Sequence, residues 1–163
     1  MLKYVETGIV FQEIPDEVTL SVNLSNCPCR CPGCHSQYLW EDSGQPLTPH
    51  SIETLLKKYA PYITCMCFMG GDAEPAAVNM LARHLYHSHP ELKVAWYSGR
   101  TRLPVVICKT YFDYIKVGPY IKHLGGLKKP TTNQRIDKKG PDGIFVDITP
   151  RFWRMDTEAK RIY

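Results

Sequence analysis

Residues 18–35 read VTLSVNLSNCPCRCPGCH, an alternating apolar run followed by a loop that holds four of the seven cysteines in the chain. The run at 18–24 is rich in β-branched residues, so we predict a core β-strand that leads directly into the loop. Pro28, Pro32 and Gly33 oppose a helix in the loop itself. The stretch therefore predicts a site built at the end of a buried strand.

The cysteines of this loop are Cys27, Cys29, Cys31 and Cys34. Thiols so close in sequence, with no signal peptide before them, favour a metal site over disulfides. Structural zinc usually takes two C-x2-C-like halves from different parts of a chain, and this loop offers one half. An iron–sulfur cluster spreads its ligands over several irons, so the spacing favours a 4Fe-4S cluster and leaves zinc open. If three cysteines bind and Cys29 does not, one iron keeps an open position for chemistry.

The C-x3-C-x2-C spacing of Cys27, Cys31 and Cys34 resembles that of the radical S-adenosylmethionine enzymes. The wider stretch 26–48 is similar to the activating proteins of the anaerobic (class III) ribonucleotide reductases, which are glycyl-radical activases. Further segments of that family follow in the same order, and the resemblance runs from about residue 8 to about residue 137. These segments are FMGGD at 68–72, WYSG at 96–99 and TNQR at 132–135.

This resemblance implies a fold, a reaction and partners. The fold is α/β, a shortened partial (β/α) barrel with a mainly parallel sheet. The cluster is a 4Fe-4S cluster held by Cys27, Cys31 and Cys34, and its open iron chelates S-adenosyl-L-methionine. Reductive cleavage then gives a 5′-deoxyadenosyl radical, which generates a glycyl radical on anaerobic ribonucleoside-triphosphate reductase. The implied partners are the glycine-bearing segment of that reductase's large subunit and a one-electron donor such as flavodoxin.

Three consecutive residues, Gly70, Gly71 and Asp72, match the family segment that receives the amino group of the cofactor. Glycines let a ligand approach the backbone, and Asp72 or exposed carbonyls can meet an ammonium group, so that Asp72 supplies charge or geometry. The same residues also suit a plain turn from strand to helix. Both interpretations stay open at this point.

Two further residues are expected to contact S-adenosylmethionine, Ser98 and Lys116. Ser98 follows a predicted strand, and Lys116 is placed to face the carboxylate of the cofactor, although a lysine at a strand end is often just exposed. In the resembled proteins an Asp precedes the glycine after the fourth strand and is associated with a cation. Val117 stands there in this sequence, which puts that cation in doubt. No side chain is expected to be catalytic beyond the cluster and the cofactor.

Strands and helices alternate along the chain, which predicts βαβ units with sites at the carboxyl ends of the strands. Thr48 and Pro49 predict the start of the first helix. The predicted helices are 49–60, 75–87 and a short one at 104–109. The predicted strands are 18–24, 63–69, 93–97, 114–117 and 143–148, with a short one around 9–11.

The remaining cysteines and histidines receive structural interpretations. Cys65 and Cys67 lie two apart on a buried strand and are predicted to be small core residues, as is Cys108. The three histidines near the end of the second helix are predicted to lie on the surface, namely His84, His87 and His89. His35 follows the last cysteine of the loop and either orients that loop, donates to a cluster sulfur or faces solvent.

Length and composition fit one domain, residues 1–163, with 44% hydrophobic and 22% charged residues. The net charge of +4 hints at nucleic acid, but the lysines of 122–129 and 138–139 read as solvated loop charge, so we expect no nucleic-acid partner. No apolar stretch suits a membrane span, and residues 1–6 lack the pattern of a secretory signal, so we expect a cytoplasmic protein. The tail 138–163, including Phe152, Trp153 and Arg154, receives no role.

Other functions compatible with the sequence lie inside and outside the superfamily. Within it, the chain could activate another glycyl-radical enzyme or act on a small molecule. From a different class, it could be a zinc-binding, non-catalytic interaction module.

Overall fold

The computed structural model of the chain describes residues 1–153. Its strands are β1 (Lys3–Val10), β2 (Thr19–Leu24), β3 (Gln45–Pro46), β4 (Cys65–Met69), β5 (Lys93–Tyr97), β6 (Tyr114–Val117), β7 (Arg135–Lys139) and β8 (Phe145–Asp147). Its helices are α1 (Pro49–Tyr59) and α2 (Pro75–Ser88). Short 3-10 turns are η1 (Gln37–Trp40), η2 (Ala60–Tyr62) and η3 (Lys109–Tyr111).

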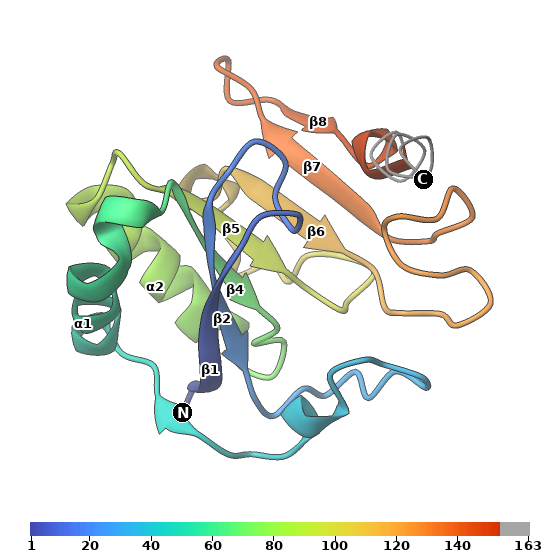
Figure 1. Ribbon diagram of the computed structural model, residues 1–163, viewed down its shortest axis with the longest axis horizontal. Helices are drawn as coiled ribbons and strands as arrows, with labels where there is room; N and C mark the ends of the chain where they lie inside the picture. Colours follow the sequence, from blue (N-terminus) through green and yellow to red (C-terminus); the bar gives the residue numbers. More distant parts are fainter. Residues whose placement is uncertain (154–163) are drawn as a thin grey trace, which may run out of the picture.

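The strands form one mixed sheet in the order β3-β1-β2-β4-β5-β6-β7-β8 (Figure 1). The four central strands, β2, β4, β5 and β6, pair in parallel. The flanking pairs are antiparallel on both sides. The α/β prediction is confirmed, while the parallel arrangement holds for the centre of the sheet and not for its edges.

Helix α1 begins as its sequence predicts. Thr48 is its N-cap, and the Thr48 side chain accepts a hydrogen bond from the backbone N–H of Ser51 at 3.1 Å. Ser51 Oγ lies 3.3 Å from the Thr48 backbone nitrogen, which donates to it and completes a capping box. Pro49 occupies the first turn, where its missing N–H costs nothing. The cap thus fixes where the crossover from β2 to β4 turns into a helix.

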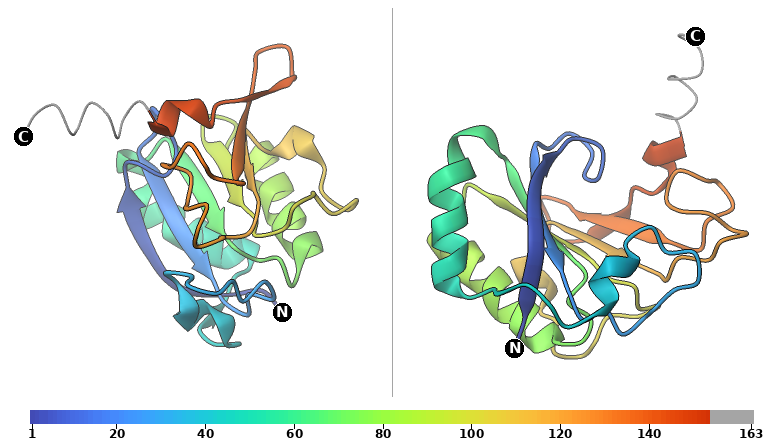
Figure 2. Two further views of the ribbon diagram at one scale, coloured as in Figure 1. Left: turned by 90° about the vertical axis from the view of Figure 1, so that its right-hand side faces the viewer. Right: turned by 60° about the horizontal axis from the view of Figure 1, so that its bottom comes forward.

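The two helices cover one face of the sheet (Figure 1, Figure 2). That face packs Val22, Phe68 and Trp96 from the strands against residues of α1 and α2, and all three are fully buried. The opposite face carries a smaller apolar cluster, and the fully buried Cys65 and Cys67 belong to it, as predicted. Its other buried members are Ile14, Ala95, Tyr114, Ile136 and Phe152. None of the helices within residues 1–153 combines the length and the hydrophobicity that a membrane span requires.

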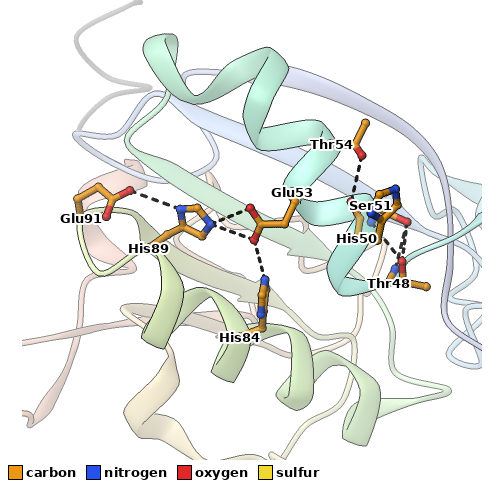
Figure 3. Close-up of polar contacts among 8 residues, drawn as sticks. All are labelled: Thr48, His50, Ser51, Glu53, Thr54, His84, His89 and Glu91. Carbon is orange, nitrogen blue, oxygen red and sulfur yellow. Dashed lines mark hydrogen bonds and ion pairs between the residues drawn. The ribbon is translucent and has the colours of Figure 1, made fainter.

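Of the three histidines predicted on the surface, two are only partly exposed, because α1 and α2 meet there (Figure 3). Glu53 of α1 accepts hydrogen bonds from His84 Nε2 at 2.7 Å and from His89 Nε2 at 3.0 Å. Both histidine side chains are about a quarter exposed (28% and 24%). His87 is exposed. Helical periodicity places a residue on a face but does not reveal a carboxylate on another helix.

Three further predictions are corrected after β5. Residues 104–109 do not form the predicted helix. They form a turn in which Ile107 N donates a hydrogen bond to Pro104 O at 3.0 Å, and the 3-10 turn η3 begins only at Lys109. Cys108 is exposed rather than buried. Lys138 and Lys139 belong to β7 rather than to a loop. Consecutive β-branched residues at 105–107 disfavour a helix.

The carboxyl ends of the central strands lie level with one another. Asn23 of β2 pairs with Met69 of β4, Met69 with Tyr97 of β5, and Tyr97 with Lys116 of β6. The segments that follow these residues therefore meet at one edge of the sheet. They are the cysteine loop and the residues that the sequence assigns to the cofactor.

Candidate active site at the carboxyl edge of the sheet

The cysteine loop, residues 25–36, is irregular and anchored near its start. Cys27 N donates to Leu39 O at 2.9 Å, and Cys34 N closes a turn inside the loop by donating to Cys31 O at 3.0 Å. Asn26 and Arg30 adopt positive φ angles of 58° and 40°. Such backbone lets the loop reverse direction within a few residues without forming a helix, as its prolines predict.

Three of the loop's thiols match the family spacing, and all are partly buried: Cys27, Cys31 and Cys34. The backbone N–H of Ser36 points at the Cys34 sulfur, 3.4 Å away. His35 is exposed, so this contact to sulfur comes from the neighbouring backbone and not from the imidazole. A backbone donor of this kind stabilises a thiolate.

The side chain of Cys29 lies against the ends of β4 and β5. Its Sγ is 3.9 Å from Asp72 Oδ2, and a Cβ atom added to Gly99 would lie 2.8 Å from the same sulfur. Burial, and then the negative charges of Asp72 and the neighbouring thiolates, raise the pKa of Cys29 to about 12. The raised pKa opposes the thiolate form of Cys29, which is the form that metals bind.

Asp72 ties two strand ends together. It is 1% exposed, and its carboxylate accepts hydrogen bonds from Ser98 Oγ at 2.6 Å and from Gly99 N at 2.8 Å. Arg100 Nη2 donates to the backbone oxygen of Asp72 at 2.8 Å. The Asp72 carboxylate therefore fixes the turn after β5, and its contribution of charge or geometry to the cofactor stays a prediction.

The glycines before Asp72 have a packing reason that the sequence did not reveal. Gly71 has a φ of 86°, and a Cβ atom there would lie 2.6 Å from Val78 Cγ2 and 2.8 Å from Leu24 Cδ1. Gly70 has a φ of 98°, and its carbonyl accepts the Trp96 indole N–H at 2.7 Å. At Gly71 the missing side chain makes room for the core of the protein itself.

Lys116 places a cation inside this edge of the sheet. Its side chain is buried, and Nζ donates to Gly118 O at 2.7 Å and to Ser98 O at 3.4 Å. Burial lowers the pKa of Lys116 to about 8, although the negative charges of Asp72 and the loop cysteines favour the ammonium form. At neutral pH Lys116 is therefore charged, and its charge lies close enough to Asp72 and the loop cysteines to interact with them.

Arg100 is a site residue that the sequence reasoning missed. Besides its bond to Asp72, its backbone N–H donates to Ser98 Oγ at 3.1 Å, and its carbonyl accepts from Gly118 N at 2.7 Å. It links the ends of β4, β5 and β6. Its place in the sequence, directly after Ser98 and Gly99 at the end of a predicted strand, could have identified it.

The segment after β6 covers one side of the cysteine loop (Figure 1, Figure 2). A Cβ atom on Gly33 would lie 3.5 Å from Lys122 Cδ and 3.6 Å from Tyr120 Cε1. Gln134 Nε2 reaches Gly118 O at 3.5 Å. The late segment that matches the family thus packs at the same edge as the cysteines.

The donor set suits a cluster bound by three cysteines. Three thiols lie on one irregular loop, the fourth thiol has a raised pKa, and a buried ammonium balances negative charge. Within residues 1–153, no three Cys, His, Asp or Glu side chains are arranged to hold a single metal ion. The ligand set therefore rests on donor chemistry and on the family pattern, and not on a preformed shell.

Comparison with known proteins identifies the domain. The model of the 4Fe-4S single cluster domain family matches residues 17–117, which run from just before β2 to the end of β6 and include more than half of the chain. No curated protein and no solved structure matches. The match supports the cluster over the zinc ion that the loop spacing left open. The chain belongs to the 4Fe-4S single cluster domain family, a domain typical of radical S-adenosylmethionine activases.

Proposed function

We propose that this protein is a radical S-adenosylmethionine activase that generates a glycyl radical on anaerobic ribonucleoside-triphosphate reductase. One observation carries the proposal: the cysteine loop, Asp72, Ser98 and Lys116 meet at the carboxyl edge of the four parallel strands. Cofactors bind at this edge in parallel α/β folds. The family match supports the cluster, and the order of the later segments supports the activase.

When bound, the cluster and S-adenosylmethionine would supply the radical chemistry: one-electron reductive cleavage of the sulfonium to methionine and a 5′-deoxyadenosyl radical, and removal of an α-hydrogen from a glycine of the partner. Cys27, Cys31 and Cys34 would hold the cluster. Cys29, kept neutral beside Asp72, would stay outside the ligand set. The chain's own tasks are to orient the cofactor and to exclude water.

The cofactor contacts follow from the charges at the site. Lys116 would face the cofactor's carboxylate, because its ammonium is buried at this edge. Asp72 would act mainly by positioning, since Ser98 and Gly99 already donate to its oxygens. Gly70 and Gly71 would shape the turn that exposes backbone oxygens to an ammonium group.

The form of the fold and the partners belong to the same proposal. We propose a single domain whose curved sheet is a shortened partial (β/α) barrel with an open mouth that admits a polypeptide. The glycine-bearing segment of the reductase's large subunit would enter there, and a one-electron donor such as flavodoxin would reduce the cluster.

The test is anaerobic reconstitution with iron and sulfide, reduction, and incubation with S-adenosylmethionine and the purified reductase. We expect 5′-deoxyadenosine, methionine and a glycyl radical detected by electron paramagnetic resonance. Asp72→Ala should weaken cofactor binding at unchanged iron content, and Asp72→Asn, which keeps the shape, should weaken it less. If the protein had its full cluster content but formed no 5′-deoxyadenosine, the proposal that it is a radical S-adenosylmethionine enzyme would be refuted. Cleavage without a glycyl radical would refute the reductase as its target.

A further inference from the structure

The segment from Gly118 to Gln134 carries positive charge only. Its charged residues are Lys122, Lys128 and Lys129, and the segment contains no Asp or Glu. All three lysines are exposed. None of them forms an ion pair with a carboxylate in residues 1–153; Lys128 Nζ donates instead to the amide oxygen of Gln12 at 2.8 Å. We call these three residues the lysine face.

The lysine face belongs to an ordered segment. Ile121 and Gly125 form a β-bridge, Thr131 Oγ1 donates to Leu124 O at 2.7 Å, and Asn133 Nδ2 donates to Pro119 O at 3.0 Å. The lysines therefore project from a shaped surface.

This face borders the loop that holds the cysteines. Lys122 packs against Gly33, which lies between Cys31 and Cys34 in the sequence. Lys128 lines the same hollow as His35. Pro32 and Gly33 are themselves exposed. The tip of the cysteine loop thus reaches the surface directly beside uncompensated positive charge.

The acidic residues around the loop do not cancel this charge. On the other flank of the loop, Glu41 forms an ion pair with Arg30 at 3.5 Å, and Asp42 forms one with Lys3 at 3.1 Å. Glu13 lines the hollow near Lys128 as a single carboxylate. On the side of the lysine face, three lysines therefore stand against the single carboxylate of Glu13.

We propose that the lysine face is the docking surface for an acidic one-electron carrier that reduces the cluster. This inference rests on the proposed function, which requires one external electron for each cleavage: the carrier is oxidised by one electron, the cluster is reduced by one, and no bond is formed in that transfer. Electron transfer needs close approach, and the exposed tip at Pro32 and Gly33 offers it. Positive charge beside that tip steers an acidic protein there and speeds association.

The test compares two reductants on the reconstituted protein. Reduced flavodoxin serves as the acidic carrier, and reduced methyl viologen, a small cation, reduces the cluster without docking. Bleaching of the cluster's visible absorption is followed by anaerobic stopped flow from about 0.02 M to about 0.5 M KCl, a range over which screening shortens to a few ångströms. Iron content is measured for every variant.

The central variant is Lys122→Gln/Lys128→Gln/Lys129→Gln. At low salt we expect it to slow reduction by flavodoxin about tenfold or more and to flatten the salt dependence, with wild type and variant converging at high salt. Reduction by methyl viologen should not slow. The matched control, Lys57→Gln/Lys58→Gln/Arg83→Gln, makes the same charge change on α1 and α2, away from the loop, and should behave as wild type.

Lys122 touches the cysteine loop, so two variants keep the test valid if the triple variant loses iron. Lys128→Gln/Lys129→Gln leaves Lys122 in place and should show part of the slower reduction. Lys122→Arg keeps the positive charge and should be reduced by flavodoxin as fast as wild type. If flavodoxin reduced the cluster at the same rate and with the same salt dependence in all variants, the proposed docking surface would be wrong. A normal flavodoxin rate with a loss of glycyl radical would assign the face to the reductase instead. Failure of methyl viologen-reduced wild type to cleave S-adenosylmethionine would refute the proposed function and not the docking surface.

Discussion

At the scale of single residues, Cys29 shows what the spacing of a motif leaves undecided. The loop spacing allows four ligands, whereas the structure holds Cys29 against Asp72 and Gly99 and raises its pKa to about 12. A thiol that resists ionisation is a poor competitor for iron. Residues that follow two other strands, Asp72 after β4 and Gly99 after β5, therefore give Cys29 an environment that the other three loop cysteines do not share.

The prediction is that Cys29→Ser keeps the iron and sulfide content of wild type, whereas each of the other loop replacements gives a degraded cluster or none. Serine is a harder ligand than thiolate and suits iron–sulfur sites poorly. The matched controls are Cys65→Ala, Cys67→Ala and Cys108→Ala, which should retain the cluster. Iron and sulfide analysis of the seven variants decides the ligand set: loss of the cluster in Cys29→Ser, or its retention in Cys31→Ser, would overturn it.

Gly71 shows a constraint that the sequence could not reveal. A glycine after a strand suits a turn or a ligand site equally well, and only the positions of Val78 and Leu24 show that a side chain would overlap the core. Gly143 provides a comparison, because its φ of 80° is close to the 86° of Gly71 but nothing lies within 4 Å of its Cβ position.

We expect Gly143→Ala to lower the free energy of unfolding by about 1 kcal/mol, the strain of a left-handed backbone. Gly71→Ala should cost about 1–3 kcal/mol more, because overpacking adds to that strain. Urea unfolding of both variants measures the difference. Equal losses would mean that the turn after β4 relaxes away from Val78 and Leu24.

At the scale of elements, amphipathic periodicity predicts α1 and α2, a run rich in β-branched residues predicts β2, and short apolar runs predict β4, β5 and β6. These elements contact the core through a regular face, so a local pattern suffices. Strand β7 is polar in sequence and only Ile136 of it is buried, and the turn at 104–109 depends on tertiary contacts such as Cys108 N to Asn79 Oδ1 at 2.8 Å. Such segments take their structure from partners far away in the chain.

The contact between α1 and α2 gives a pH-dependent prediction. Hydrogen bonds from His89 and then His84 lower the pKa of Glu53 below its ordinary value of 4.5. A carboxylate whose pKa is depressed by folding stabilises the protein above its unfolded pKa, and this stabilisation is lost as pH falls through the folded pKa. The contribution is modest, because Glu53 is 38% exposed and solvent screens it.

Glu53→Gln should therefore lower the Tm relative to wild type at about pH 6, and this difference should shrink as pH falls below about 4.5. The matched control is Glu91→Gln, since Glu91 is 75% exposed and lies 3.6 Å from His89 Nδ1. It should change the Tm less at every pH. A Tm difference for Glu53→Gln that stays constant down to the acid limit would show that the histidines do not pair with this carboxylate.

At the scale of the whole molecule, the sheet separates two unequal cores. The helices seal one face, as βαβ alternation predicts, whereas the other face depends on Ile14 and Phe152, which come from opposite ends of the described chain. Neither lies in a segment whose pattern marks it as core. Sequence alone therefore locates the site at the carboxyl edge, but not the groups that close the face behind it.

Phe152 is 3% exposed and covers the face that contains Cys65 and Cys67. Burial raises the pKa of both thiols, so in the folded protein they are unreactive as well as inaccessible. Phe152→Ala should lower the free energy of unfolding by about 3–5 kcal/mol and should make both cysteines react with an alkylating reagent under native conditions.

The matched control is Phe145→Ala, because Phe145 is half-buried and packs against the other core. This variant should leave both thiols protected, and mass spectrometry of the alkylated peptides distinguishes the two cases. If Phe152→Ala left both thiols as protected as Phe145→Ala does, the face behind the site would be closed without Phe152. Its closure would then depend on Ile14 and the segment between β1 and β2, the only other described segment that contributes a buried residue to this cluster from outside the sheet.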